Sequence, residues 1–322
     1  MVDVNFKKKS HFNFLQKESI FRGIYYVLVL VAISFLVKVF LENWQKISSY
    51  EWHFNFGYLV LALLISIFQL FFLAMIWRKI ILFLEPEKTI SRFLAIRIHV
   101  FSIFGKYLPG ISWSPVAKLY FSQKSEFSSP KLAVSVIYEN LISVIAGFML
   151  SLFLLSTFFK LPMFNSYFGS VAVIVLGSIL VYPKIFYRLT GFVTNLLRRE
   201  AIPRREFLKT GDIVKITFHY FFFFILGGLG LYFLVNSVFP LPITAIPVVV
   251  GAYTLAIVSG VVVLFAPSGI GVREAVLVAI LSSYFSVESS ILISILARAW
   301  TTAAEIVSFV LVWTYGRFKL KT

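Results

Sequence analysis

Cysteine is absent from the chain, and aspartate occurs only at Asp3 and Asp212. The missing thiols exclude disulfide bonds and thiolate chemistry. Neither aspartate has an acidic neighbour, so a metal-dependent transferase that reads nucleotide sugars would lack its paired carboxylates. The four histidines have no metal-ligand spacing, and no glycine loop ending in Lys-Ser or Lys-Thr occurs. We therefore expect no metal, no cofactor and no catalytic residue, which favours a protein other than an enzyme.

Charged residues are also scarce, at 14% of the chain, whereas 59% is hydrophobic and the mean hydropathy is +0.90. A soluble domain with a solvated surface does not carry this composition. Apolar runs near the ~20 residues that cross a bilayer recur throughout, which predicts an all-α, polytopic transmembrane bundle of about eight spans. The expected spans are 23–41, 56–77, 131–157, 166–182, 213–237, 243–266, 272–286 and 289–315. They form one domain over 23–316, between basic tails at 1–22 and 317–322.

Residues 93–121 interrupt this pattern. Pro109 and Gly110 break the helix there, and a broken helix in lipid must be covered by protein or line a wet cavity. We expect this segment to enter the membrane and turn back. A second interruption, with Pro267, Gly269 and Gly271, precedes 272–286, for which a crossing and a re-entrant path both remain open.

The distribution of basic residues predicts the orientation. The net charge is +16, and if 272–286 crosses, the lysines and arginines gather in the tails and in alternate loops, whereas Lys38, Lys46 and Lys160 fall on the other side. The positive-inside rule then puts both termini in the cytoplasm, in the cell (inner) membrane. Basic loops also attract anionic headgroups, which accounts for the charge without nucleic acid.

Ionisable residues at membrane depth form the candidate site. Glu139, beside Asn140, lies within an expected span, where a charge costs ~2.5–3.5 kcal/mol and needs a partner. Arg298, Thr302 and Glu305 share one helix face, but Arg298 and Glu305 are ~10 Å apart along the axis, too far for an ion pair. Each must find its counter-charge on another helix.

Arg273 and Glu274 are natural partners, together with Glu139, Arg97 and Lys106. Three structural alternatives stay open. Arg273 can extend to the cytoplasmic interface, Glu274 can cap its helix, and Glu139 can pair with Arg298 as structural glue. The functional interpretation is a polar cavity that accepts a phosphate or another charged headgroup, helped by the backbone N–H groups that the glycines free before a helix start. Two interrupted segments, one in each half, are a pointer to a transport site.

Four stretches carry a family resemblance: "FGKYLPG" (104–110), "YEN" (138–140), "APSGIGVREA" (266–275) and "RAWTTAAEI" (298–306). They resemble the membrane region of lysylphosphatidylglycerol synthases, within a flippase-like superfamily. In the full synthases a soluble aminoacyl-transferase domain follows this region, which is implicated in moving lipid between leaflets. We expect no such domain in this chain, so the resemblance implies handling of a polar-headed lipid without aminoacyl transfer.

The leading hypothesis is a transporter that translocates or handles a phospholipid or a lipid-linked sugar. The predicted substrate-binding residues are Lys106, Glu139, Asn140, Arg273, Glu274, Arg298, Thr302 and Glu305. One alternative is a membrane enzyme acting on a polyprenyl-phosphate lipid. Another is a membrane partner of a separate soluble synthase or glycosyltransferase, docked on the basic loop at 184–209.

Overall fold

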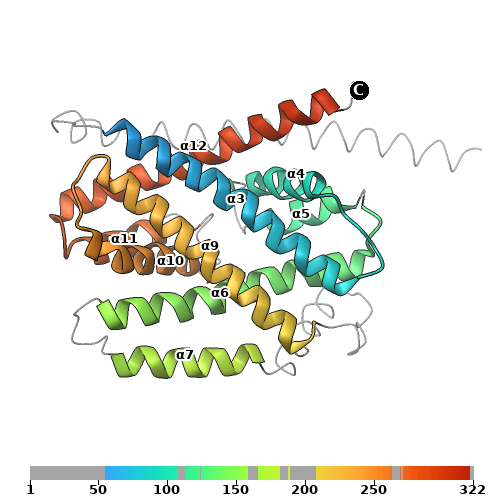
Figure 1. Cartoon of the computed structure of the whole chain (residues 1–322), viewed down its shortest axis with the longest axis horizontal. Coiled ribbons are helices and arrows are strands. Elements are labelled where there is room, and N and C mark those ends of the chain that lie inside the picture. Colours follow the sequence, from blue (N-terminus) through green and yellow to red (C-terminus); the bar gives the residue numbers. More distant parts are fainter. Residues whose placement is uncertain are drawn as a thin grey trace, which may run out of the picture.

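Long apolar helices dominate the structure (Figure 1). The computed structural model describes residues 55–107, 113–123, 125–158, 166–181, 188, 208–262, 269 and 271–319. Within those ranges every regular element is a helix, and five segments are long and apolar enough to cross a membrane. They are α3 (Phe56–Leu84), α6 (Ser129–Phe158), α9 (Thr210–Asn236), Ile243–Val262 and Val287–Arg317. The all-α, polytopic prediction is confirmed; the expected span at 23–41 lies outside the described residues.

The helix starts follow local chemistry. The side chain of Asn55 accepts a hydrogen bond from the backbone N–H of Tyr58, which caps α3. Ser91 caps α4 (Arg92–Ile103) in the same way through the N–H of Leu94. Small polar side chains are favoured at this position because they satisfy backbone donors that the first helical turn leaves open.

The interrupted segment at 93–121 forms a hairpin of short helices. α4 continues into the 3-10 turn η1 (Phe104–Tyr107), and α5 (Ser114–Ser122) packs back against α4. At 1.5 Å per residue these helices are roughly 18 Å and 14 Å long, against ~30 Å of hydrocarbon. Gly105 allows the close return, because a Cβ there would lie 2.9 Å from the backbone of Trp113. The re-entrant path expected for this segment is the one observed.

The segment at 272–286 contains a helix too short to cross by itself. α11 (Val272–Leu281) has ten residues, about 15 Å, and it packs against α10 (Ile246–Val262). The topology in which 272–286 crosses alone is therefore corrected: 243–281 forms a second hairpin. Gly269 and Gly271, at its turn, have φ values of +67° and +83°, which favour glycine. Pro267 lies outside the described residues, as do Pro109 and Gly110.

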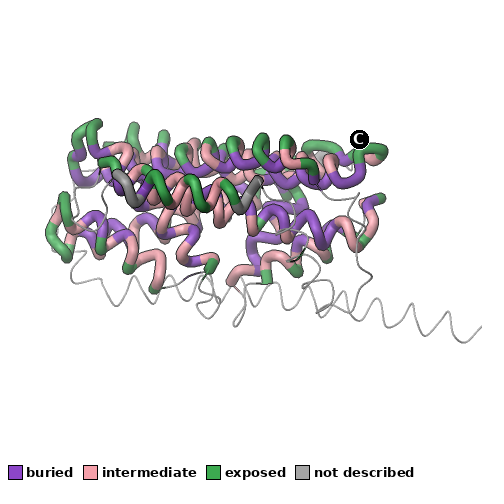
Figure 2. The backbone as a smooth tube through the Cα atoms, turned by 90° about the horizontal axis from the view of Figure 1, so that it is seen from below, coloured by how far each residue is buried: buried purple, intermediate pink, exposed green. Residues whose placement is uncertain are grey.

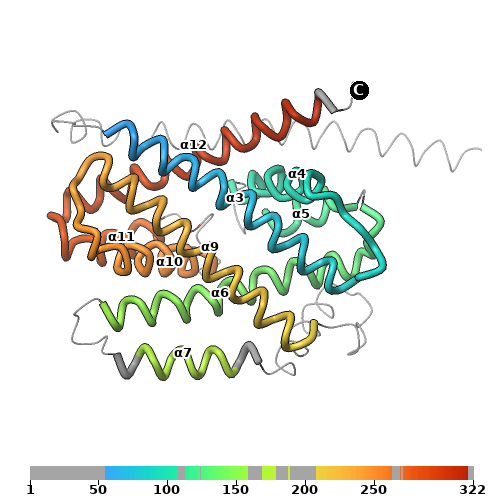
Figure 3. The backbone as a smooth tube through the Cα atoms, in the orientation of Figure 1, coloured from blue at the N-terminus to red at the C-terminus, as the bar shows by residue number. Residues whose placement is uncertain are grey.

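The two hairpins hold equivalent places in two halves of the chain that run in opposite directions (Figures 1 and 3). The first half runs α3, hairpin α4/α5, α6; the second runs α9, hairpin α10/α11, α12 (Val287–Lys319). α3 and α9 pack together, and the hairpins enter from opposite ends of the bundle. The broken tips therefore point toward its middle.

Two apolar cores hold this arrangement. One surrounds Trp77 and Tyr220, and the other lies among α9, α10, α11 and α12. α7 (Ser166–Val181) packs on the outside of α6. Figure 2 shows buried and exposed stretches alternating along the long helices, as expected when one face meets the bundle and the other meets lipid.

Candidate functional site

The tip of the first hairpin contacts the middle of α12. Lys106 forms an ion pair with Glu305, and the hydroxyl of Tyr107 donates to Oε2 of the same carboxylate at 2.7 Å. The Tyr107 hydroxyl also lies 3.2 Å from that of Thr302. Glu305 therefore finds its counter-charge on another element, as expected. This cluster, Lys106, Tyr107, Thr302 and Glu305, is called the tip cluster below.

A cavity of about 60 Å³ lies beside the tip cluster, between the second hairpin and α3, α9 and α12. Arg298 lies roughly 16 Å along α12 and Gln69 roughly 20 Å along α3, counted from ends on the same side. These depths put the cavity near the middle of a ~30 Å hydrocarbon core. The polar side chains that line it are Ser66, Gln69, Tyr253, Arg273, Glu274, Ser294, Arg298, Trp300 and Thr301.

Most neutral polar groups of the cavity are already bonded. The amide of Gln69 donates to the carbonyl of Phe223 and to the hydroxyl of Tyr253, both at 3.0 Å. Gly227 makes room for this pair, since a Cβ there would lie 2.2 Å from the Tyr253 ring. Gln69 and Tyr253 thus form a fixed wall of the cavity.

Arg273 is the exception. Among the described residues, neither its buried Nε atom nor the indole Nε1 of Trp300 in the same cavity has a hydrogen-bond partner. The side chain passes over Gly260 and Gly269; a Cβ on either glycine would lie within 3.0 Å of Nε. A buried donor without an acceptor costs ~1–3 kcal/mol, and more when it is charged. The cavity therefore has donors that require an acceptor from outside the described chain.

Glu274 has a structural role here. Its carboxylate accepts the backbone N–H of Gly271 at 2.7 Å, which caps α11 where a negative charge meets the helix dipole. The capping alternative for Glu274 is thus confirmed. Arg273 lines the interior cavity and does not extend to the cytoplasmic interface.

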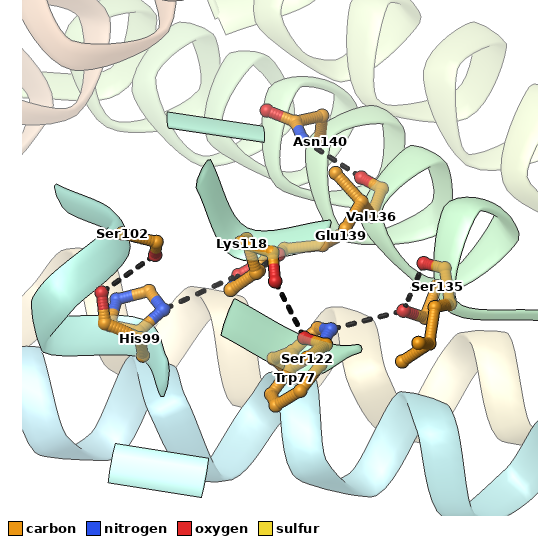
Figure 4. A network of polar contacts seen from close by, with 10 residues as sticks. Trp77, His99, Ser102, Lys118, Ser122, Ser135, Val136, Glu139 and Asn140 are labelled. Carbon is orange, nitrogen blue, oxygen red and sulfur yellow. Dashed lines mark hydrogen bonds and ion pairs between the residues drawn. The ribbon is translucent and has the colours of Figure 1, made fainter. Parts of the chain in front are cut away.

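Glu139 lies in a separate cluster inside the first hairpin. Its two carboxylate oxygens each accept from Lys118 Nζ at 2.6 Å, and the Nδ1 atom of His99 lies 3.9 Å from Oε1 (Figure 4). The ammonium of Lys118 also lies 4.9 Å from the ring centre of Trp77, a favourable cation–π contact. We call Glu139, Lys118 and His99 the hairpin triad.

These positions correct the expected partner of Glu139 and the expectation of one shared cavity. Glu139 pairs with Lys118, not with Arg298, because α5 folds back against α6. Glu139 and Glu305 are not among the residues that line the cavity, so the site consists of neighbouring clusters, not one pocket. Asn140 is exposed and donates to the carbonyl of Val136, away from the triad. Arg97, a candidate counter-charge, is exposed as well, beside the ring of Phe101.

Taken together, the hairpin triad, the tip cluster and the cavity contain an excess of positive charge. The cations are Lys106, Lys118, Arg273 and Arg298, and the carboxylates are Glu139, Glu274 and Glu305. Among these described side chains the cations outnumber the carboxylates by one, which favours an anionic ligand.

Several of these residues were missed from the sequence. Gln69 had a readable signal, as an amide inside the apolar run 56–77. Lys118 and His99 had none, because their neighbours are set by the return of the hairpin. Among the described residues, no group of three or more His, Cys, Asp or Glu side chains is arranged to hold a metal.

The fold and these clusters define a multi-pass membrane protein with a polar site at mid-depth. The sequence profile of the lysylphosphatidylglycerol synthase TM region matches residues 26–308, and the chain belongs to that family. The family relates it to lipid handling. Searches of curated proteins and of solved structures gave no match.

Proposed function

We propose that this protein translocates a polar-headed lipid across the bilayer, with the phosphate of the headgroup held in the cavity by Arg273. The observation that supports this most directly is the buried Nε of Arg273, for which no described residue supplies an acceptor. Trp300 offers a second open donor in the same cavity. Phosphate supplies several acceptor oxygens and a negative charge, which match both the open donors and the excess positive charge.

The neighbours of Arg273 support the same ligand chemistry. Arg298 lines the cavity with it, and the charge of each acts on the other. Like charges in a weakly solvated site repel each other, and an anion bound beside both would reduce that repulsion. The shared group can be the phosphate of a phospholipid or that of a lipid-linked sugar.

The size of the cavity implies that the hairpins move. About 60 Å³ holds a few water molecules, at roughly 10–15 Å³ each on this measure, and not a complete headgroup. The described conformation is then a closed state, in which the tip cluster joins the first hairpin to α12. Opening requires these contacts to separate while acyl chains stay in lipid, as in rigid-body alternation between two repeats.

The basic residues support an orientation with the ends of α3 and α12 in the cytoplasm. The end of the bundle that holds the close of α3 and the start of α4 carries Arg78, Lys79, Lys88 and Arg92, and α12 ends there with Arg317 and Lys319. A two-hairpin topology keeps an even number of spans if 23–41 crosses. Both termini then lie in the cytoplasm.

The test uses proteoliposomes with trace fluorescent phosphatidylglycerol or phosphatidylcholine. Leaflet exchange is read from the fraction of probe that dithionite bleaches. We expect Arg273→Gln to slow phosphatidylglycerol exchange at least about ten-fold, equivalent to ~1.4 kcal/mol. Arg97→Gln, which removes an exposed arginine of α4, should leave it unchanged. Unaltered exchange in a folded Arg273→Gln protein would refute the proposal, and native mass spectrometry of copurified lipids distinguishes a phospholipid from a lipid-linked sugar.

A further inference from the structure

His99 is the buried polar side chain that the lipid site leaves unexplained. It is 5% exposed, and neither ring nitrogen has a hydrogen-bond partner in the part of the chain that the structure describes. A neutral imidazole has one donor and one acceptor, and leaving both unmet in a protein interior is unusual. The side chain of Ser102 does not satisfy the ring, because it donates to the backbone carbonyl of His99 (Figure 4).

The geometry supplies a place for a proton between His99 and Glu139. The Nδ1 atom lies 3.9 Å from Oε1 of Glu139, about 1 Å beyond hydrogen-bond distance. Lys118 already donates to both oxygens, but a carboxylate has about four acceptor positions, so Oε1 can accept a second donor. A small shift of the ring would make an imidazolium–carboxylate pair.

Nearby charges determine whether His99 binds this proton. Burial of the ring and, from α5 and η1, the ammonium groups of Lys118 and Lys106 oppose a further positive charge. The carboxylate of Glu139 on α6, 3.9 Å away, favours it. On α12, Glu305 offsets Lys106 through their ion pair. On α9, the buried hydroxyl of Tyr220 lies within the electrostatic influence of the Glu139 carboxylate, and no described residue hydrogen-bonds to it. A protonated His99 must therefore share the carboxylate that Lys118 now holds.

We propose that His99 is a proton-binding site, and that its proton weakens the Lys118–Glu139 pair that joins α5 to α6. This rests on the proposed lipid translocation, to which it adds a coupled ion. His99 lies roughly 10 Å along α4 from the basic end of the bundle, which is close enough for protons to arrive from that side. Acid on that side frees the first hairpin, whose tip holds the cavity closed through Lys106 and Glu305.

One experiment reads the proton without transport. In detergent, ¹⁵N-histidine spectra of the full chain identify His99 by the signal that is lost in His99→Gln. We expect this signal to change from imidazole to imidazolium at a pH below the ordinary histidine midpoint of about 6.5, because burial and the two lysines oppose the added charge, and the midpoint to move in Glu139→Gln. A signal that stays neutral throughout, or a midpoint unaffected by Glu139→Gln, would overturn the proton site.

The second experiment reads the coupling. Exchange of fluorescent phosphatidylglycerol should be about three-fold or more faster below the midpoint found in the spectra than near pH 8 in the unaltered protein, and independent of pH in His99→Gln. His219→Gln is the matched control, since that histidine lies beside Lys79 and stacks on Phe72, outside the triad. Equal pH responses in His99→Gln and the control would overturn the coupling. If no variant exchanges lipid, translocation itself fails, and the spectra still decide on the proton site.

Discussion

The side chain of Arg273 lies directly over the Cα of Gly260, with no space for a methyl group between them. A Cβ on Gly260 would lie 2.5 Å from Nε and 2.8 Å from Cγ of the arginine. Arg273 begins α11 and Gly260 is near the end of α10, so the contact joins the two arms of the second hairpin. Because Gly260 has no side chain, the guanidinium of Arg273 can enter the cavity.

Gly260→Ala should displace Arg273 and slow leaflet exchange of phosphatidylglycerol at least about ten-fold, as loss of ~1.4 kcal/mol does. The fold should persist, because alanine is favoured over glycine inside a helix by about 0.8–1.0 kcal/mol. Gly177→Ala in α7 is the matched control, since its Cβ would meet only Met149 at 3.5 Å. Equal exchange rates in both variants would contradict the role given to the arginine.

The ion pair between Lys106 and Glu305 should show strong coupling in stability measurements. Lys106→Met or Glu305→Gln alone leaves one buried charge without its partner, a loss of about 3–5 kcal/mol for pairs of this kind. Combining the two substitutions should recover much of that loss. Thermal unfolding in detergent of the unaltered protein, both single variants and the double variant gives the double-mutant cycle. If the two single effects simply add, Lys106 and Glu305 are not energetically coupled.

Substitutions at the adjacent residues Glu139 and Asn140 should differ strongly in how much stability they remove. Glu139→Gln removes the charge that holds Lys118, which is 5% exposed at its side chain, so we expect a loss of ~3–5 kcal/mol. Asn140→Ala changes an exposed side chain bonded only to its own helix and should stay within ~0.5 kcal/mol. The measurement is the shift in Tm at fixed detergent and lipid; similar shifts for the two variants would contradict the placement of the triad.

Helix periodicity and break residues were sufficient to predict most of the architecture. Five of the expected spans appear as long helices, and "YLPG" correctly marked the first hairpin because a proline followed by a glycine favours a break and a turn. The segment at 272–286 was ambiguous since its apolar length is compatible with crossing, and only the packing of α11 on α10 showed the hairpin.

Pairing within the site was harder to predict, for a geometric reason. Glu139 and Lys118 are 21 positions apart on two helices, and their contact depends on where α5 turns back. The link between Glu305 and Lys106 spans 199 positions. A buried charge needs a partner, so the sequence indicated that both glutamates must have one. Lys106 was among the candidate partners for Glu305, whereas Lys118 was not named as a partner for Glu139. A neutral side chain such as that of Trp300 needs no counter-charge, so nothing in the sequence gave a reason to select it.

Trp300→Phe tests whether the cavity binds an anion through donors or merely has room for one. An aromatic ring is kept at this position, although it is smaller, and the buried N–H, which has no partner among the described residues, is removed. A hydrogen bond to a charged group contributes ~1.5–3 kcal/mol, which predicts about ten-fold or weaker binding of an anionic lipid. Thermal shifts titrated with phosphatidylglycerol and with phosphatidylcholine measure this. Without lipid, removal of the unmet donor should offset part of the stability that the smaller ring loses. If phosphatidylglycerol stabilises both proteins equally, the indole does not contact the headgroup, and phosphate binding would have to rely on the arginines alone.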